Sequence, residues 1–126
     1  MKDQKYVILC VDDDQDTLDM LRIALESGGY KVVEAVTAEE AMKKYKSEKP
    51  DFLIVDLMME EVDAGTRFVM RLKAMGNTAP TYMLSSVGDS LGMQKNYSDL
   101  GLSGIFQKPI DPQTLLTTVK TKLAKK

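Results

Sequence analysis

Four aspartates fall within six residues of the stretch VDDDQD (residues 11–16), directly after the apolar run YVILC. Carboxylates this close repel one another, and the repulsion grows where they are withdrawn from water. A hard divalent cation relieves such crowding, and Mg²⁺ is normally held by one or two carboxylates together with phosphate oxygens and waters. Asp12 and Asp13, at the end of the apolar run, are therefore candidate metal ligands.

Other polar groups follow apolar runs in the same way. FLIVD ends in Asp56, PTYML is followed by Ser85, and GIFQ is followed by Lys108. In an open parallel α/β sheet the carboxyl ends of the strands share one edge, where sites form. We therefore expect these groups to meet in one pocket. Carboxylates, a cation and a lysine suit phosphoryl transfer, in which an aspartate can form an acyl phosphate and a serine can bind a phosphoryl oxygen.

Five apolar runs alternate with helical patterns. Strands are expected at residues 6–11, 31–35, 52–56, 80–84 and 104–107, and helices at 16–27, after Thr37, between a loop at 57–65 and Gly76, at 89–100, and from Pro112. Continuous apolar strands indicate a sheet covered on both faces, and helical crossovers imply parallel strands. The fold class is therefore α/β, a doubly wound five-stranded sheet.

Capping residues and apolar spacing predict how the helices begin and pack. Thr37 with Glu40 forms a capping box, Asp111 is the expected N-cap of the last helix, and Asp16 that of the first, with Asp14 facing solvent. The apolar face of each helix follows from its spacing. The expected core residues of the first and last helices are Leu18, Leu21, Leu25, Leu116, Val119 and Leu123. Phe68, Leu72 and Met75 mark the apolar face of the helix that ends at Gly76.

Composition narrows the function classes. The 126 residues suggest one domain, and the net charge of −2 argues against direct nucleic-acid binding. No stretch approaches the length of a membrane span, and the N-terminal apolar run is too short for a signal peptide. Cys10 is the only cysteine, which fits a reducing cytoplasm, and the absence of histidine excludes histidine-based catalysis on this chain.

The four pieces VDDD, IVDLMM, MLSS and QKPI, in this order and at this spacing, resemble the receiver domain of bacterial two-component response regulators. The resemblance covers essentially the whole chain. It implies a flavodoxin-like (βα)5 fold with strand order 2-1-3-4-5. It also implies that residues 1–126 form a single receiver domain that acts as a phosphorylation switch.

The resemblance assigns a role to each candidate site residue. Asp56 resembles the phosphoryl-accepting aspartate and is also an expected metal ligand. Asp13 resembles the direct Mg²⁺ ligand, Asp12 binds through water or assists, and the Met58 backbone carbonyl is the third protein ligand. Ser85 is similar to the switch Ser/Thr.

Lys108 resembles the lysine that pairs with the phosphoryl group, and Lys108-Pro109 the family's cis peptide. The implied phosphoryl donor is a sensor histidine kinase or phosphotransfer protein. The output is an unknown downstream protein, with a homodimer as a further candidate and no direct nucleic-acid contact or membrane insertion. Any enzymatic activity would be limited to self-phosphorylation and autodephosphorylation. The chain is either free-standing or a fragment of a longer regulator.

Three residues depart from the family pattern. Glu60 stands where the loop after the nucleophile often has proline, and Ala64 where it has glycine, with Gly65 as a substitute turn residue. Ile105 stands at the position of the switch aromatic, and strand alternation directs the adjacent Phe106 to the other face.

Three alternatives were weighed. DDDQD has the first spacings of a calcium loop, but Thr17 and Ile23 stand where such a loop needs glycine and glutamate. An aspartate-nucleophile phosphatase would leave the strand that ends in Asp56 without a role. A receiver-like binding module that does not use phosphate remains open.

Overall fold

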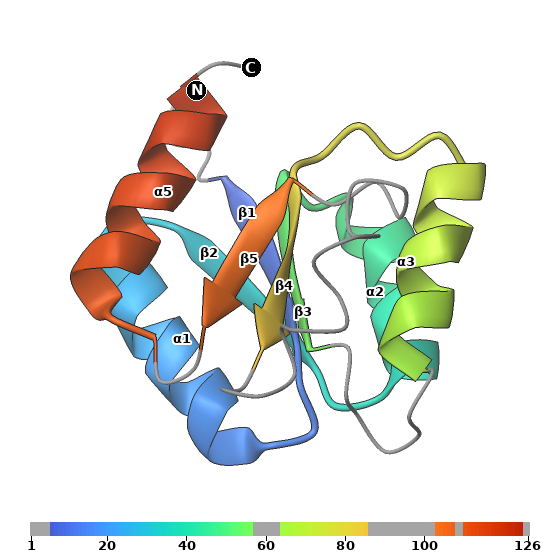
Figure 1. The fold of residues 1–126 in the computed structure, drawn as a ribbon, viewed down its shortest axis with the longest axis horizontal. Helices are drawn as coiled ribbons and strands as arrows, with labels where there is room; N and C mark the ends of the chain where they lie inside the picture. The colour runs from blue at the N-terminus through green and yellow to red at the C-terminus, as the bar shows by residue number, and fades with distance from the viewer. Residues whose placement is uncertain (1–5, 57–63, 86–102, 108–109, 125–126) are drawn as a thin grey trace.

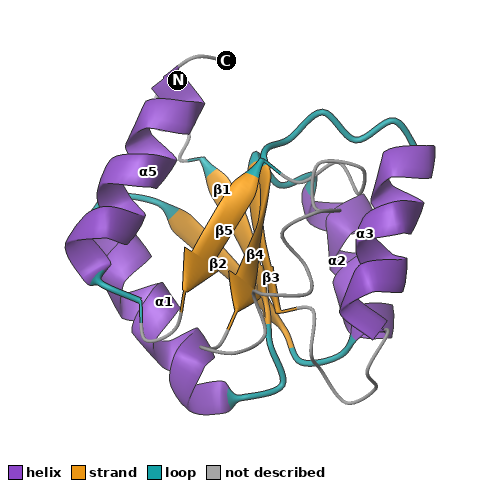
Figure 2. Ribbon diagram, in the orientation of Figure 1, coloured by secondary structure: helices purple, strands orange, loops and turns teal. Residues whose placement is uncertain are grey.

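The fold is a five-stranded parallel sheet with helices on both faces (Figures 1 and 2). The computed structural model describes residues 6–56, 64–85, 103–107 and 110–124. The strands are β1 (Val7–Val11), β2 (Lys31–Ala35), β3 (Phe52–Asp56), β4 (Thr81–Ser85) and β5 (Gly104–Gln107). The helices are α1 (Gln15–Ser27), α2 (Ala38–Glu48), α3 (Ala64–Ala74) and α5 (Pro112–Ala124).

The strand order is β2-β1-β3-β4-β5, and every neighbouring pair is parallel. This confirms the predicted fold class and strand order. The predicted helix at 89–100 lies outside the described residues. Because all strands run the same way, their carboxyl ends share the lower edge of the sheet in Figure 1, next to the beginning of α1.

Alternating side chains of the strands build two hydrophobic clusters. Ile8, Cys10 and Phe106 belong to the cluster under α1 and α5, whereas Leu9 and Val55 belong to the cluster under α2 and α3. Every residue of β3 is buried, as its unbroken apolar sequence predicts for a central strand. Burial of apolar surface in these two clusters supplies the main stabilisation of the sheet.

Local signals fix most helix ends. The Thr37 hydroxyl accepts a hydrogen bond from Glu40 N (3.1 Å), and the Asp111 carboxylate accepts from Thr114 N (3.0 Å). The Glu40 carboxylate closes its side of the capping box on Val36 N (2.9 Å). Gly29 ends α1 with φ at +91°, which allows Tyr30 N to donate back to the Leu25 carbonyl.

One predicted helix start and two predicted core positions were wrong. Helix α3 begins at Ala64, so Gly65 lies in its first turn and not in a preceding loop. In α5 Leu115 is fully buried, whereas the predicted core residue Leu116 is only partly buried against the α1/α5 cluster. Met75, expected on the apolar face of α3, follows the helix end and is 48% exposed.

Candidate metal centre

Three carboxylates meet at the carboxyl edge of the two neighbouring strands β1 and β3. Asp12, Asp13 and Asp56 each offer an oxygen, and these oxygens all lie within 4.8 Å of one another. Asp12 is fully buried (0% exposed), Asp56 is 6% exposed, and Asp13 is exposed. We call these three residues the acidic cluster. The structure thus brings together the three carboxylates that were predicted from the sequence as metal ligands.

The conformation of Asp12 is fixed by the end of the β1–β2 ladder. Its backbone N–H donates to the Ala35 carbonyl (3.1 Å), which extends the pairing one residue beyond β1. Its Oδ1 accepts from Asp14 N (2.9 Å), the short-range bond by which aspartates stabilise turns. The chain therefore turns immediately after the strand, with the Asp12 carboxylate buried.

Asp14, and not the predicted Asp16, caps α1. Its carboxylate accepts from Asp16 N (3.1 Å) and from the Thr17 hydroxyl (2.9 Å), and the helix begins at Gln15. Asp14 is exposed, as expected. Asp16 lies in the first turn, where a negative charge suits the positive end of the helix dipole. The cap fixes where α1 begins, three residues after Asp12.

Asp56 is the last residue of β3. It follows Ile54 at the two-residue spacing of a strand face and lies in register with Leu84 of β4. Ser85 is the next residue of β4 and pairs with Gln107 of β5, so its backbone lies at the same edge. Met58 and Lys108 lie outside the described residues.

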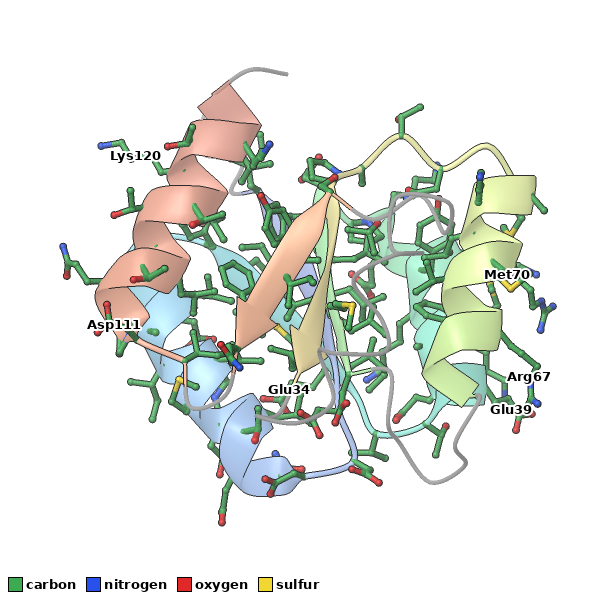
Figure 3. All side chains as sticks on the ribbon, in the orientation of Figure 1. Glu34, Glu39, Arg67, Met70, Asp111 and Lys120 are labelled. Carbon is green, nitrogen blue, oxygen red and sulfur yellow. The ribbon has the colours of Figure 1, made fainter. Side chains whose placement is uncertain are left out.

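A polar network that the sequence did not reveal holds α1 to the edge strand β2. The Arg22 guanidinium pairs with Glu34 (2.7 Å) and with Asp19 (3.0 Å), and Gln15 Nε2 donates to Asp19 (3.0 Å). Glu34, labelled in Figure 3, comes from β2 and is in register with Cys10. The spacing of Asp19 and Arg22 was readable as a helical pair, but nothing local predicted Glu34.

The interior beside the acidic cluster disfavours further negative charge. Burial raises the pKa of the Cys10 thiol, and the carboxylates of Glu34 and Asp12 raise that pKa further. Cys10 is therefore a protonated core residue and not a nucleophile.

The donor set of the acidic cluster fits a hard cation. Carboxylate oxygens are the ligands that Mg²⁺ and Ca²⁺ prefer, and a divalent charge compensates three aspartates that crowd one another. Asp12 and Asp56 are buried, whereas Asp13 is exposed to solvent. An arrangement of this kind can bind a cation that keeps positions for water or phosphate oxygens.

In the part of the chain that the structure describes, no helix combines the length and apolar character needed to cross a membrane.

Comparisons with known proteins agree with this geometry. The profile of the response regulator receiver domain matches residues 8–120. The alkaline phosphatase synthesis transcriptional regulatory protein PhoP of Bacillus subtilis is 32% identical over 117 residues, which are 90% of this chain and 46% of that protein. The 14.6 kDa protein in the sodA1 3′ region of Leptolyngbya boryana is 35% identical over 115 residues, covering 90% of this chain and 86% of that protein.

A solved structure extends the likeness to three dimensions. The chemotaxis response regulator CheY4 of Vibrio cholerae has a TM-score of 0.80 at 29% identity, over 94% of this chain and 98% of the other. The chain spans less than half the length of PhoP but most of CheY4.

Proposed function

Because the chain belongs to the response regulator receiver domain family, we propose that it is a phosphorylation switch whose phosphoryl acceptor is Asp56. The observation that carries the proposal is the acidic cluster, with oxygens of Asp12, Asp13 and Asp56 within 4.8 Å at one edge of the sheet. The phosphoryl donor is a phosphohistidine of a sensor histidine kinase or phosphotransfer protein.

The residues that would hold Mg²⁺ are Asp12, Asp13 and Asp56, with the Met58 backbone carbonyl as a further ligand. When bound, Mg²⁺ neutralises part of the carboxylate charge and orients phosphate oxygens, which is what phosphoryl transfer requires. Asp13 is the ligand on the solvent side. Asp12, held by Asp14 N and by Ala35, is the rigid ligand on the inner side.

In the transfer step, an oxygen of the Asp56 carboxylate attacks phosphorus as the P–N bond of the donor breaks. The electron pair of that bond stays with the imidazole nitrogen, so a donor protonated on its other nitrogen leaves as neutral imidazole. The Ser85 hydroxyl then donates to a phosphoryl oxygen, and the Lys108 ammonium pairs with the added negative charge. Hydrolysis of the acyl phosphate by water resets the switch.

The proposal extends to the whole chain. Residues 1–126 form a single receiver domain that acts in the cytoplasm, and its phosphorylated state changes the affinity for a downstream protein or for a second copy. Direct binding to nucleic acid is not part of the proposal, because the net charge of −2 favours no such contact.

The test is intact mass after incubation with Mg²⁺ and acetyl phosphate. The parent chain should gain one phosphoryl group, and Asp56→Asn should gain none. Asp16→Asn is the matched control, because it removes a neighbouring exposed carboxylate outside the acidic cluster and should be phosphorylated like the parent. If the parent chain binds Mg²⁺ but gains no phosphoryl group and does not bind the phosphoryl mimic fluoroberyllate, it would instead be a phosphate-independent binding module.

A further inference from the structure

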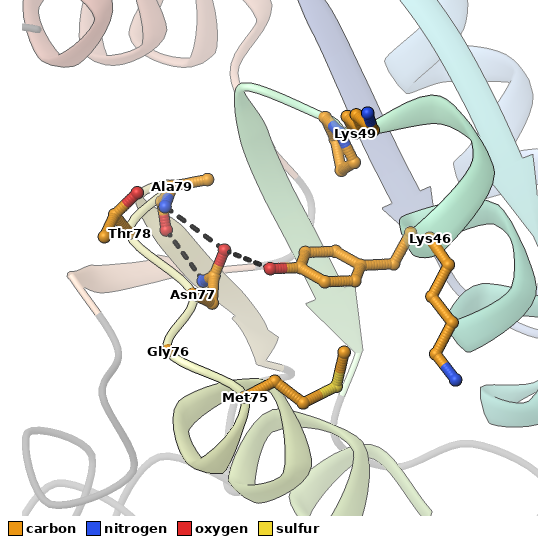
Figure 4. A pocket seen from close by; sticks show the side chains of 9 residues that line it. Lys46, Lys49, Met75, Gly76, Asn77, Thr78 and Ala79 are labelled. Carbon is orange, nitrogen blue, oxygen red and sulfur yellow. Dashed lines mark hydrogen bonds between the residues drawn. The ribbon is translucent and has the colours of Figure 1, made fainter.

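A groove lies at the amino edge of the sheet, opposite the acidic cluster. It is formed by the end of α2, by Pro50 just before β3, and by residues 75–79 between α3 and β4, and its volume is about 360 Å³. Figure 4 shows Lys46, Lys49, Met75 and Asn77 arranged around this hollow. We call it the amino-edge groove.

Hydrogen bonds within the chain fix the shape of the groove. The Tyr45 hydroxyl donates to Asn77 Oδ1 (2.9 Å), which joins α2 to the α3–β4 connection. Asn77 Nδ2 donates to the Ala79 carbonyl (3.0 Å) and to the Thr81 hydroxyl (3.2 Å). The lining of the groove is about half polar and half apolar, and the side chain of Met75 is 48% exposed at its margin.

The margin of the groove is positively charged. Lys46, Lys49 and Arg71 are exposed, and among the described residues none of the three forms an ion pair. Met75 N donates to the Arg71 carbonyl (3.0 Å), so Arg71 lies one turn before the groove, in the last turn of α3, and does not line it. The nearby Glu48 is engaged elsewhere, with Lys31 at 3.6 Å. A local excess of positive charge therefore stands in a chain whose net charge is −2.

Helix dipoles account for only part of this charge. Cations in the last turns of α2 and α3 suit the negative helix ends, which explains Lys46 and Arg71. Lys49 follows α2 with φ at +51°, a left-handed conformation that glycine adopts without strain. Backbone geometry thus gives no reason for a lysine at position 49, whereas a charged groove margin does.

We propose that the amino-edge groove binds an acidic, extended segment of a partner protein. One apolar side chain of that segment would occupy the hollow beside Met75, and its carboxylates would pair with Lys46 and Lys49. The volume is near the lower limit for small-molecule pockets, which suits one or two side chains of a passing peptide. Charge complementarity identifies the peptide as acidic.

This site is independent of the proposed phosphorylation. Six residues of extended chain separate Pro50 from Asp56, which is about 20 Å at the rise of a β-strand. Surface charges that far apart are screened at physiological salt, where the Debye length is about 8 Å. The groove is therefore a constitutive anchor, occupied equally before and after Asp56 is modified.

The experiment is an NMR titration of the ¹⁵N-labelled full chain with a synthetic peptide of glutamates and aspartates around one central leucine. Shifts should be confined to the backbone amides of residues 45–49 and 71–79. Lys46→Glu combined with Lys49→Glu should weaken binding by about tenfold or more, because two favourable surface pairs become repulsive. Lys120→Glu is the matched control, since Lys120 points outward from α5 on the other side of the molecule (Figure 3).

Two further arms complete the test. A peptide with alanine in place of leucine should bind more weakly, and Asp56→Asn should leave the affinity unchanged. The proposal is overturned if the acidic peptide causes no shifts at millimolar concentration, if the shifts map to other elements, or if charge reversal has no effect. Equal binding of inorganic tripolyphosphate would also overturn it, because the groove would then be a simple anion site.

Discussion

Replacing Asp13 with asparagine should stabilise the metal-free protein. The carboxylate oxygens of Asp12, Asp13 and Asp56 lie within 4.8 Å of one another, so folding brings together charges that are separated in the unfolded chain. Asp13 is exposed, so its neutralisation removes repulsion without leaving a new buried polar group. The side chain keeps nearly the same shape, which isolates the electrostatic contribution.

The magnitude follows from Coulomb's law. At 4.8 Å and a dielectric constant near that of water, which suits an exposed group, each repulsion is about 0.9 kcal/mol. Asp13 takes part in two such repulsions, so the gain at low salt is about 2 kcal/mol, falling to about 1 kcal/mol at physiological ionic strength. For a domain of this size that gain raises Tm by about 4 °C per kcal/mol.

Urea and thermal unfolding in EDTA, at low and high salt, measure the effect. Asp16→Asn is the matched control: that carboxylate lies outside the acidic cluster and in the first turn of α1, so its neutralisation should slightly lower stability. Saturating Mg²⁺ should reverse the ranking, because a ligand at about 100 times its Kd adds about 2.7 kcal/mol to a chain that binds it. Asp13→Asn should lose most of that gain.

Three results would refute this reasoning. Asp13→Asn would be no more stable than the parent in EDTA, or Asp16→Asn would be stabilised to the same extent, or the difference would not shrink as salt rises. Any of these would mean that the three carboxylates are not mutually repulsive in the folded chain.

Three other predictions concern the cap of α1, the contact between β5 and Tyr82, and the buried thiol of Cys10. Asp14→Ala should lower the free energy of unfolding by about 1 kcal/mol through loss of the α1 cap, with Asp14→Ser restoring most of it in urea titrations. Gly104→Ala should lower the free energy of unfolding by about 1–3 kcal/mol, because the new Cβ would lie 2.5 Å from Tyr82 Cε2. Adding Tyr82→Leu to that variant should recover part of the lost stability. An unchanged Tm for the single variant would contradict the close contact. The raised pKa of Cys10 means that the folded chain holds the thiol proton more tightly than the unfolded chain does. Stability should therefore fall as pH rises past the ordinary thiol value of 9.0, and Cys10→Ala should show a shallower fall in unfolding experiments across that range.

The sequence predicted the sheet well because the physical signal there is strong. FLIVD and YVILCV are unbroken apolar runs, and their burial on both faces leaves little choice of conformation or position. Helix starts were readable where one capping residue stood alone, as at Thr37 and Asp111. At the start of α1 several aspartates offered the same chemistry, and only the three-dimensional turn at Asp12 selects among them.

Other details depend on contacts between distant segments. In α5, Leu115 and Leu116 both fit helical spacing with Val119, and the packing of α5 against α1 decides between them. Gly28 marks how close that packing is, since a Cβ there would lie 2.7 Å from Leu116 Cδ2. Neither of these contacts could be predicted from the local sequence.

Some features of the candidate site could likewise be predicted from the sequence, and others could not. The convergence of Asp12, Asp13 and Asp56 was predictable, because parallel strands place their carboxyl ends at one edge. The link from Arg22 to Glu34 was not, because it joins α1 to an edge strand through side chains with no shared periodicity. The amino-edge groove arises from two connections far apart in sequence, so it too was invisible at that level.

The packing of β5 limits which of its side chains could respond to a change at the acidic cluster. Ile105 packs against the α2/α3 cluster, at the position where the resemblance implies a switch aromatic, and a β-branched chain has few rotamers to exchange. The neighbouring ring of Phe106 faces the other way, is 4% exposed, and stacks on Tyr82 with ring centroids 4.8 Å apart. Tyr82 in turn stacks on Phe52 at 5.3 Å, so Phe106 is the end of an aromatic row inside the core. Ile105 therefore has no ring to swing, and in this structure the ring of Phe106 is held inside the core. Within the described residues, the pairing of β4 with β5, in which Ser85 lies opposite Gln107, is the most direct remaining connection from that edge of the sheet to β5.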